Sequence, residues 1–75
     1  MFLKENFCER LRTARIDANM TQSDVASVLG KKKQYVSRWE IGVTEPNLEQ
    51  LHSLCEILSV SADYLLGLNE TSLLK

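Results

Sequence analysis

Near the start of the chain, apolar residues recur at intervals of three and four positions. They are Phe7, Leu11, Ala14 and Ala18. This spacing puts them on one face of a helix, so it predicts an amphipathic helix over about residues 5–18. A second, shorter set of apolar residues follows at Val25, Ala26 and Leu29. That set predicts a second short helix, which faces inward along the same kind of stripe.

Residues that begin and end helices separate the apolar sets. The expected N-cap residues are Thr21, Asn47 and Ser61, and the expected C-terminal glycines are Gly30, Gly42 and Gly67. Asp24 and Gln50 stand three positions after a cap, as in a capping box. This punctuation predicts three further helices, over about residues 32–40, 48–58 and 62–66. No stretch alternates with period two, so we predict no strand and an all-α fold of five short helices.

The later helices have their own apolar stripes. In the third predicted helix, Val36 and Trp39 face inward by spacing, which favours the core over base stacking for the tryptophan. The fourth helix has a longer stripe: Leu48, Leu51, Leu54, Cys55 and Leu58. A free cysteine in such a stripe is typical of a small buried apolar residue. We therefore assign Cys55 to the core.

The chain contains few cysteine and histidine residues that could bind a metal or carry out catalysis. Cys8 and Cys55 are the two cysteines, and His52 is the single histidine. A structural zinc site needs four Cys or His ligands in close pairs, which this chain lacks. There is also no Gly-rich phosphate loop and no Ser/His/Asp set. We predict no cofactor, no small-molecule ligand and no enzymatic activity.

Composition is that of one small globular domain. The chain has 75 residues, 44% of them apolar and 25% charged. No apolar run approaches the roughly 18 residues of a membrane span, and the N-terminus does not resemble a secretory signal. These features predict a cytoplasmic protein without a membrane partner. A core of this size supplies no more than about 3–5 kcal/mol of net stability, which leaves room for a partner subunit.

Charge is separated along the chain although the net charge is only −1. Eight basic and four acidic residues precede Glu40, whereas one basic and six acidic residues make up the charges from Glu40 onward. The segment from Lys31 to Arg38, both included, contains four cations and no anion. Such a run is either a solvated face or a surface that binds a polyanion.

The segment from Gln22 to Trp39 has the residue types that two closely crossing helices need. The crossing point requires a small side chain, the tight turn requires glycine, and the second helix requires a large apolar residue to hold it. Ala26, Gly30 and Val36 meet these requirements in that order. Two helices joined in this way form a helix-turn-helix.

Four motifs in order then resemble one known family. They are Thr21-Gln-Ser-Asp-Val-Ala-Ser-Val-Leu-Gly30, Tyr35-Val-Ser-Arg-Trp-Glu-Ile-Gly42, Glu45-Pro-Asn-Leu-Glu-Gln-Leu51 and Leu58-Ser-Val-Ser-Ala-Asp-Tyr-Leu-Leu-Gly67. Together they resemble the lambda-repressor-like helix-turn-helix family, which includes Cro, phage-repressor domains and regulators of the xenobiotic-response-element type. The resemblance implies a compact five-helix DNA-binding domain over residues 1–67, followed by a C-terminal tail over residues 68–75.

In that family the third helix lies in the major groove of double-stranded DNA. The resemblance implies that the base-reading residues are Lys32, Lys33, Gln34, Ser37 and Arg38, of which Arg38 reaches either a base or the backbone. Lysine donates to guanine, and glutamine pairs with adenine. The implied phosphate contacts are Thr21, Gln22, Lys31, Tyr35 and Thr44. For Tyr35, packing within the protein is an equal alternative.

Some positions tie the predicted helices together or depart from the family pattern. Arg15 and Glu40 match a pair that links the first helix to the end of the third. Lys31 and Lys32 replace the usual apolar and capping residues, which forgoes about 1 kcal/mol from the cap. Glu45 is acidic in a loop where the family often has basic residues, which weakens any phosphate contact there.

One such domain reads half of a palindromic site, so we predict a homodimer. The expected interface consists of Tyr64, Leu65, Leu66, Leu68, Leu73 and Leu74. The predicted function is a prokaryotic or phage transcriptional regulator, a repressor by the resemblance, which binds an operator and is associated with the nucleoid when bound. The alternative is a DNA-binding antitoxin or another protein-interaction module with the same fold, in which the leucine-rich end binds a protein.

Overall fold

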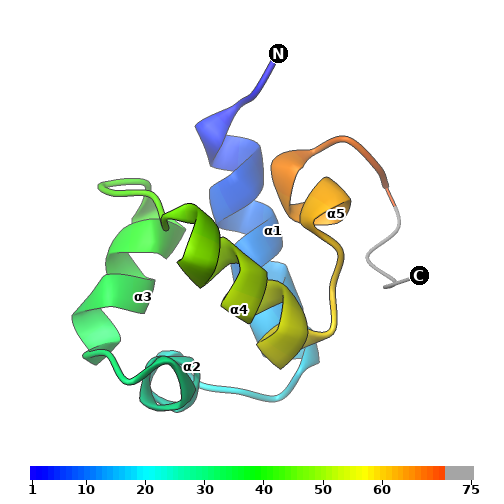
Figure 1. Ribbon diagram of the computed structural model, residues 1–75. Coiled ribbons are helices and arrows are strands. Elements are labelled where there is room, and N and C mark those ends of the chain that lie inside the picture. Colours follow the sequence, from blue (N-terminus) through cyan, green and yellow to red (C-terminus); the bar gives the residue numbers. More distant parts are fainter. Residues whose placement is uncertain (71–75) are drawn as a thin grey trace.

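The computed structural model describes residues 1–70, and in this range it contains five helices and no β-sheet (Figure 1). The helices are α1 (Lys4–Asp17), α2 (Gln22–Leu29), α3 (Lys33–Ile41), α4 (Leu48–Leu58) and α5 (Ala62–Leu66). Their order and bounds confirm the all-α, five-helix prediction to within one residue at each end. Over the same range, none of the five helices combines the length and apolar character that a membrane crossing requires.

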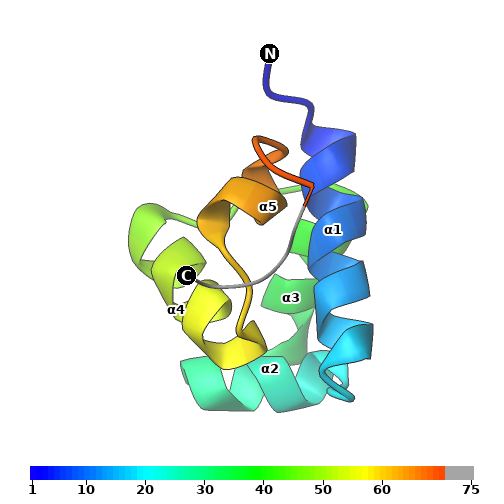
Figure 2. The same ribbon diagram turned by 90° about the vertical axis from the view of Figure 1, so that its right-hand side faces the viewer.

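Each of the five helices packs mainly against two others. α2 packs against α3 and α4, α1 packs against α3 and α5, and α4 also contacts α5. Figure 2 shows α2 near the C-terminal end of α1 and roughly perpendicular to it, with α5 beside the N-terminal half of α1. As a result, α3 is in contact with α1 and α2 on its inner side. Its other side lies at the edge of the molecule and faces outward (Figure 1).

The core lies where these helices meet. Its largest fully buried side chains are Trp39, Leu11, Leu54, Leu65, Val25 and Val36. The predicted inward positions of α3 and the predicted core position of Cys55 are confirmed. Burying an apolar side chain of this size contributes about 1.5–3 kcal/mol, so this cluster supplies most of the force that assembles the short helices.

Two apolar residues assigned to inward stripes lie on the surface instead. Leu48 is 84% exposed because it is the first residue of α4, where the helix has just left the preceding loop. Ala18 is exposed because α1 ends at Asp17 and Ala18 is already its C-cap. In both cases the predicted apolar stripe included one residue at the end of the helix that does not pack against the core.

The predicted capping boxes are formed. The Thr21 hydroxyl accepts a hydrogen bond from the Asp24 amide at 3.0 Å, and the Asp24 carboxylate accepts one from the Thr21 amide at 2.9 Å. Asn47 and Gln50 exchange the same pair of bonds at 2.8 Å each. Each box satisfies two amides that a helix start would otherwise leave unbonded, so α2 and α4 begin at sharply defined residues.

Candidate nucleic-acid interface

The turn between α2 and α3 has the geometry that the sequence predicts. Ala26 is buried at the crossing of the two helices, and Val36 of α3 is fully buried. Gly30 ends α2 in the left-handed conformation with a φ of 68°, and the Lys31 amide donates to the Ala26 carbonyl at 2.9 Å. A side chain at Gly30 would be strained by this φ value, so the turn depends on glycine.

α3 has two faces of different character. Val36 and Trp39 point into the core. The opposite face exposes Lys33, Gln34 and Arg38 to solvent, and Ser37 lies half-buried beside them. Lys31 and Lys32 are exposed just before the helix. The structure therefore brings all five residues predicted to read bases to the outer side of α3 or to its start.

The start of α3 lacks the caps found at α2 and α4. Lys32 is the N-cap residue, its side chain makes no capping hydrogen bond, and the first turn contains no acidic residue. Lysines next to a helix N-terminus are unfavourable because they repel the positive end of the helix dipole. Uncapped amides and cations together make a site that attracts anions.

The residues predicted to contact phosphate differ in exposure and in the contacts that they already make within the protein. Lys31 and Thr44 are exposed, whereas the Thr21 hydroxyl is used in the capping box. Tyr35 is 41% exposed as a residue, and the Lys31 Nζ lies over its ring, 5.4 Å from the ring centroid. This cation–π contact keeps both groups on the outer surface at the start of α3.

Gln22 lies at the start of α2 but is not free. It is half-buried, and its Nε2 donates to the Glu40 Oε1 at 3.1 Å. The bond links the first residue of α2 to the end of α3. This contact with Glu40 was not part of the sequence prediction, which placed Gln22 against a DNA phosphate and a base-reading side chain.

The predicted pair of Arg15 and Glu40 is formed. The Arg15 Nε donates to Glu40 Oε2 at 2.6 Å, Nη2 donates to Oε1 at 3.2 Å, and Nη1 donates to the Met20 carbonyl at 2.9 Å. The side chains are 13% and 3% exposed, respectively. Each of the three guanidinium nitrogens therefore donates one hydrogen bond, and the pair fixes α3 relative to α1 and the loop before α2.

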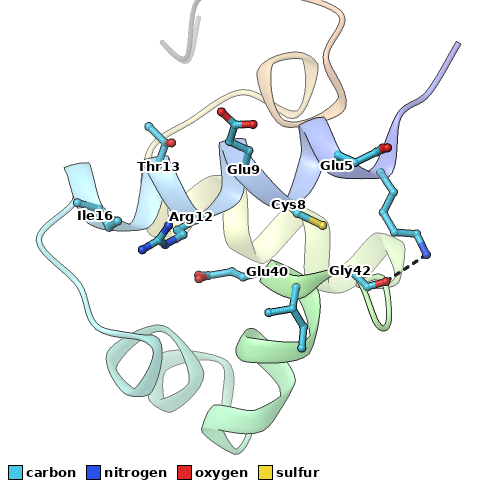
Figure 3. Close-up of a pocket in the computed structure, with 10 residues that line it drawn as sticks. Glu5, Cys8, Glu9, Arg12, Thr13, Ile16, Glu40 and Gly42 are labelled. Carbon is cyan, nitrogen blue, oxygen red and sulfur yellow. Dashed lines mark hydrogen bonds between the residues drawn. The ribbon is translucent and has the colours of Figure 1, made fainter.

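An open groove of about 670 Å³ lies between α1 and the C-terminal end of α3 (Figure 3). Cys8 and Arg12 of α1 lie on one side of it, with Glu40 and Gly42 on the other. Lys4 Nζ donates to the Gly42 carbonyl at 3.4 Å across one end. A Cβ at Gly42 would come within 3.4 Å of Cys8 Sγ, so the end of α3 packs closely on α1.

Neither cysteine is activated by its surroundings. Burial raises the pKa of the Cys55 thiol, and burial is also the main cause that raises the pKa of Cys8 despite the nearby Lys4. A thiol with a raised pKa is a weak nucleophile near neutral pH. In residues 1–70, no three His, Cys, Asp or Glu side chains are grouped so that they could hold a metal ion.

The predicted dimer residues differ in how accessible they are. Leu68 is 76% exposed, and Tyr64 and Leu66 are half-buried. Leu65 is fully buried against the core, so its side chain is not available to a second subunit and that assignment is corrected. It points inward because α5 packs against both α1 and α4 at this residue's side. Leu73 and Leu74 lie outside the described residues.

Comparison with known proteins fits this geometry. A helix-turn-helix family model matches residues 11–65, which span α2, the turn and α3. The chain belongs to the lambda-repressor-like helix-turn-helix family. Residues 11–65 also include the second half of α1, all of α4 and nearly all of α5, so the family pattern extends to the helices packed around α2 and α3.

Members of this family that resemble the chain include regulators and repressors. The SPbeta prophage-derived uncharacterized HTH-type transcriptional regulator YonR of Bacillus subtilis is 42% identical over 60 residues, which are 80% of this chain and 56% of YonR. Repressor protein C2 of Salmonella phage P22 is 38% identical over 58 residues, which are 77% of this chain and 27% of C2. The chain therefore spans about half of YonR and a smaller part of C2.

Solved structures of the P22 repressor have the same fold. The crystal structure of P22 c2 repressor in complex with a synthetic operator superposes with a TM-score of 0.78 at 35% identity, over 84% of this chain and 96% of that one. The solution structure of its DNA-binding domain gives a TM-score of 0.78 at 34% identity, over 92% and 93%.

Proposed function

We propose that the chain is a DNA-binding transcriptional regulator that inserts α3 into the major groove of double-stranded DNA. The observation that carries this proposal is the outer face of α3, where cations and a glutamine are exposed on a helix whose inner face is locked in the core. The match to P22 c2 repressor, which was solved in complex with a synthetic operator, supports DNA binding by this chain.

The base-reading role falls to the exposed residues of α3. Lys33 and Gln34 lie in its first turn, which is the part of a recognition helix that approaches base edges. Lysine donates to guanine O6 and N7, and glutamine forms two hydrogen bonds with adenine N6 and N7. Lys32, Ser37 and Arg38 flank them, and Arg38 is long enough to contact a base or the backbone.

The phosphate contacts are proposed for the residues around the base-reading turn. Lys31 and Tyr35 flank the uncapped start of α3, Thr44 lies in the loop that follows it, and Thr21 and Gln22 lie at the start of α2. Gln22 donates one Nε2 hydrogen to Glu40, so its second Nε2 hydrogen is the donor proposed for a phosphate. These contacts orient the protein but carry no sequence information.

A homodimer completes the proposed regulator, because one domain reads only half of a palindromic operator. Two recognition helices must be about 34–36 Å apart, one turn of DNA. The proposed interface is Tyr64, Leu66 and Leu68 with Leu73 and Leu74 of the tail. Analytical ultracentrifugation should show a dimer on the operator duplex. A monomer at every concentration, with and without DNA, would contradict the dimer.

Selection of bound duplexes from a random pool tests the function directly. We expect a consensus with two inverted half-sites one helical turn apart and an affinity that falls steeply with salt, because phosphate contacts release counterions. A pool that shows no enrichment, or an affinity that is independent of salt, would contradict DNA binding. A consensus with a single half-site would retain DNA binding and contradict the dimer.

A further inference from the structure

Arg10 of α1 makes a group of contacts that the sequence analysis did not single out. Its Nη1 donates to the Tyr64 carbonyl at 2.8 Å and to the Asn69 carbonyl at 2.7 Å. Its Nη2 lies 3.4 Å from the Glu70 carboxylate. Its Cζ lies 4.7 Å from the centroid of the Tyr64 ring. One guanidinium thus holds α5 and the segment after α5 against α1.

These contacts depend on the shape of arginine. The Arg10 side chain is only 19% exposed, whereas Glu70 is 97% exposed, so the carbonyls and the ring face hold the guanidinium more firmly than the carboxylate does. A planar guanidinium donates in several directions in its plane and stacks on a ring with its face. A lysine ammonium is a point charge and cannot make all these contacts together.

Arg10 adds polar contacts to a very short helix, which is otherwise held by its cap and by the buried Leu65. α5 has only five residues, and an isolated helix of that length is unstable. Arg10 binds the Tyr64 carbonyl near its C-terminal end and the Asn69 carbonyl beyond Gly67. The predicted domain boundary after residue 67 is therefore crossed by a bond back to α1.

The same helix also holds the recognition helix. Arg15 lies five positions after Arg10 in α1 and binds Glu40 at the end of α3. Arg10 binds α5 and the following segment, which includes the proposed dimer residues Tyr64 and Leu68. α1 therefore packs against both α3 and α5 (Figure 2). Through these contacts it fixes the position of the proposed dimer surface relative to the outer face of α3.

We propose that Arg10 is a positioning residue, which orients the dimer surface relative to α3 and so sets the distance between the two recognition helices of a dimer. This inference rests on the dimer under the proposed function. Arg10 touches neither DNA nor the second subunit in this scheme. Arg10 should therefore affect how tightly the dimer binds two half-sites at once. It should not affect how tightly one domain binds one half-site.

The experiment compares Arg10→Lys and Arg10→Met with Arg12→Met, which removes an exposed arginine from the same helix. Binding is measured on the selected palindromic duplex, on duplexes with one base pair added or removed between the half-sites, and on a single half-site. Thermal unfolding is followed for each variant, and binding is measured well below the melting temperature. Glu70→Gln is included because Glu70 is exposed and its contact is the longest of the group.

We expect both Arg10 variants to bind the palindromic duplex at least about tenfold more weakly, because two sites that are badly spaced lose the gain from simultaneous binding. Binding to one half-site should stay within about twofold, and the preference for the original spacing should shrink. Arg12→Met should keep the spacing preference. Glu70→Gln should behave like the unchanged protein.

Equal losses on the palindromic duplex and on the half-site would overturn the proposal and leave Arg10 a purely stabilising residue. Unchanged binding to all duplexes by folded Arg10 variants would overturn it as well. Failure of the dimer itself is recognised separately, because the unchanged protein would then show no preference for two half-sites over one.

Discussion

The inner and outer faces of α3 show how one short helix serves two purposes. On the inner face, Val36 and Trp39 are buried in the core, and Glu40 is bound by Arg15 and Gln22. On the outer face, Lys33, Gln34 and Arg38 are exposed to solvent. The inner face fixes the direction of the helix, and the outer face is free to vary with little effect on the fold.

The start of α3 adds a second contrast, with the starts of α2 and α4. Those two helices have reciprocal capping boxes, whereas α3 begins at a lysine that makes no capping bond. Local stability is thus lower at the point where the proposed DNA contact occurs. An anion such as a DNA phosphate would satisfy the amides that the protein leaves uncapped.

The largest effect should come from the inner face. Trp39→Ala leaves a cavity at the centre of the core and should lower the free energy of unfolding by about 3–5 kcal/mol. For a domain of this size that is comparable to the whole net stability, so the variant should be mostly unfolded at 25 °C. Circular dichroism with urea measures the loss. Ile41→Ala, at a residue 69% exposed, is the control and should change stability by less than about 0.5 kcal/mol.

Glu40→Ala should be the next most damaging change. It leaves the Arg15 guanidinium nearly buried without its carboxylate, and it removes the acceptor of Gln22, which together should cost roughly 3 kcal/mol. Urea unfolding checks this value. Glu45→Ala, which removes an exposed carboxylate from the following loop, should leave the midpoint almost unchanged. Similar midpoints for the two variants would show that the buried pair does not hold α3.

Changes on the outer face should affect DNA and spare stability. Lys33→Ala and Gln34→Ala should each lose about 1–3 kcal/mol of binding on the selected site and much less on random duplex. The control Lys4→Ala removes the same charge from the first residue of α1, which contacts the Gly42 carbonyl at the opposite end of α3 from Lys33, and it should not alter the preference for the selected site. Fluorescence anisotropy measures both duplexes. Equal losses on both by Lys33→Ala would mean that Lys33 contacts only phosphate.

The smallest effect concerns the cap of α3. Lys32→Ser supplies the missing N-cap hydroxyl and should raise the free energy of unfolding by about 1 kcal/mol. Lys32 is also one of the proposed base-reading residues, so the same change should weaken binding to the selected duplex. Opposite changes in stability and DNA binding would sharpen the contrast between the starts of α3 and α2. A variant that loses stability would show that Lys32 already stabilises the helix start.

Local features were predicted well because their causes lie within a few residues of each other. Thr21 with Asp24 and Asn47 with Gln50 form the expected boxes, since both partners belong to one helical turn. The inward positions of Val36 and Trp39 follow from helical periodicity alone. Leu48 was misplaced because periodicity does not indicate how far along a helix the neighbouring elements reach.

Contacts between distant residues were harder to predict. The pair of Arg15 and Glu40 was expected only through resemblance to a family, and the Gln22 contact to the same carboxylate was not expected. Arg10 gave no signal, because two of its partners are main-chain carbonyls that every residue possesses. Leu65 was placed on the dimer surface because a five-residue helix is too short to show which side is apolar.

The order of residues alone therefore determined the five helices, their caps and the residues that α3 presents, because hydrogen bonding within a turn and the 3.6-residue period act over short distances. Only the tertiary structure decided which arginine binds which helix and which leucine of α5 remains accessible. Those outcomes depend on how helices far apart in the chain pack together, and no local pattern encodes the distance between them.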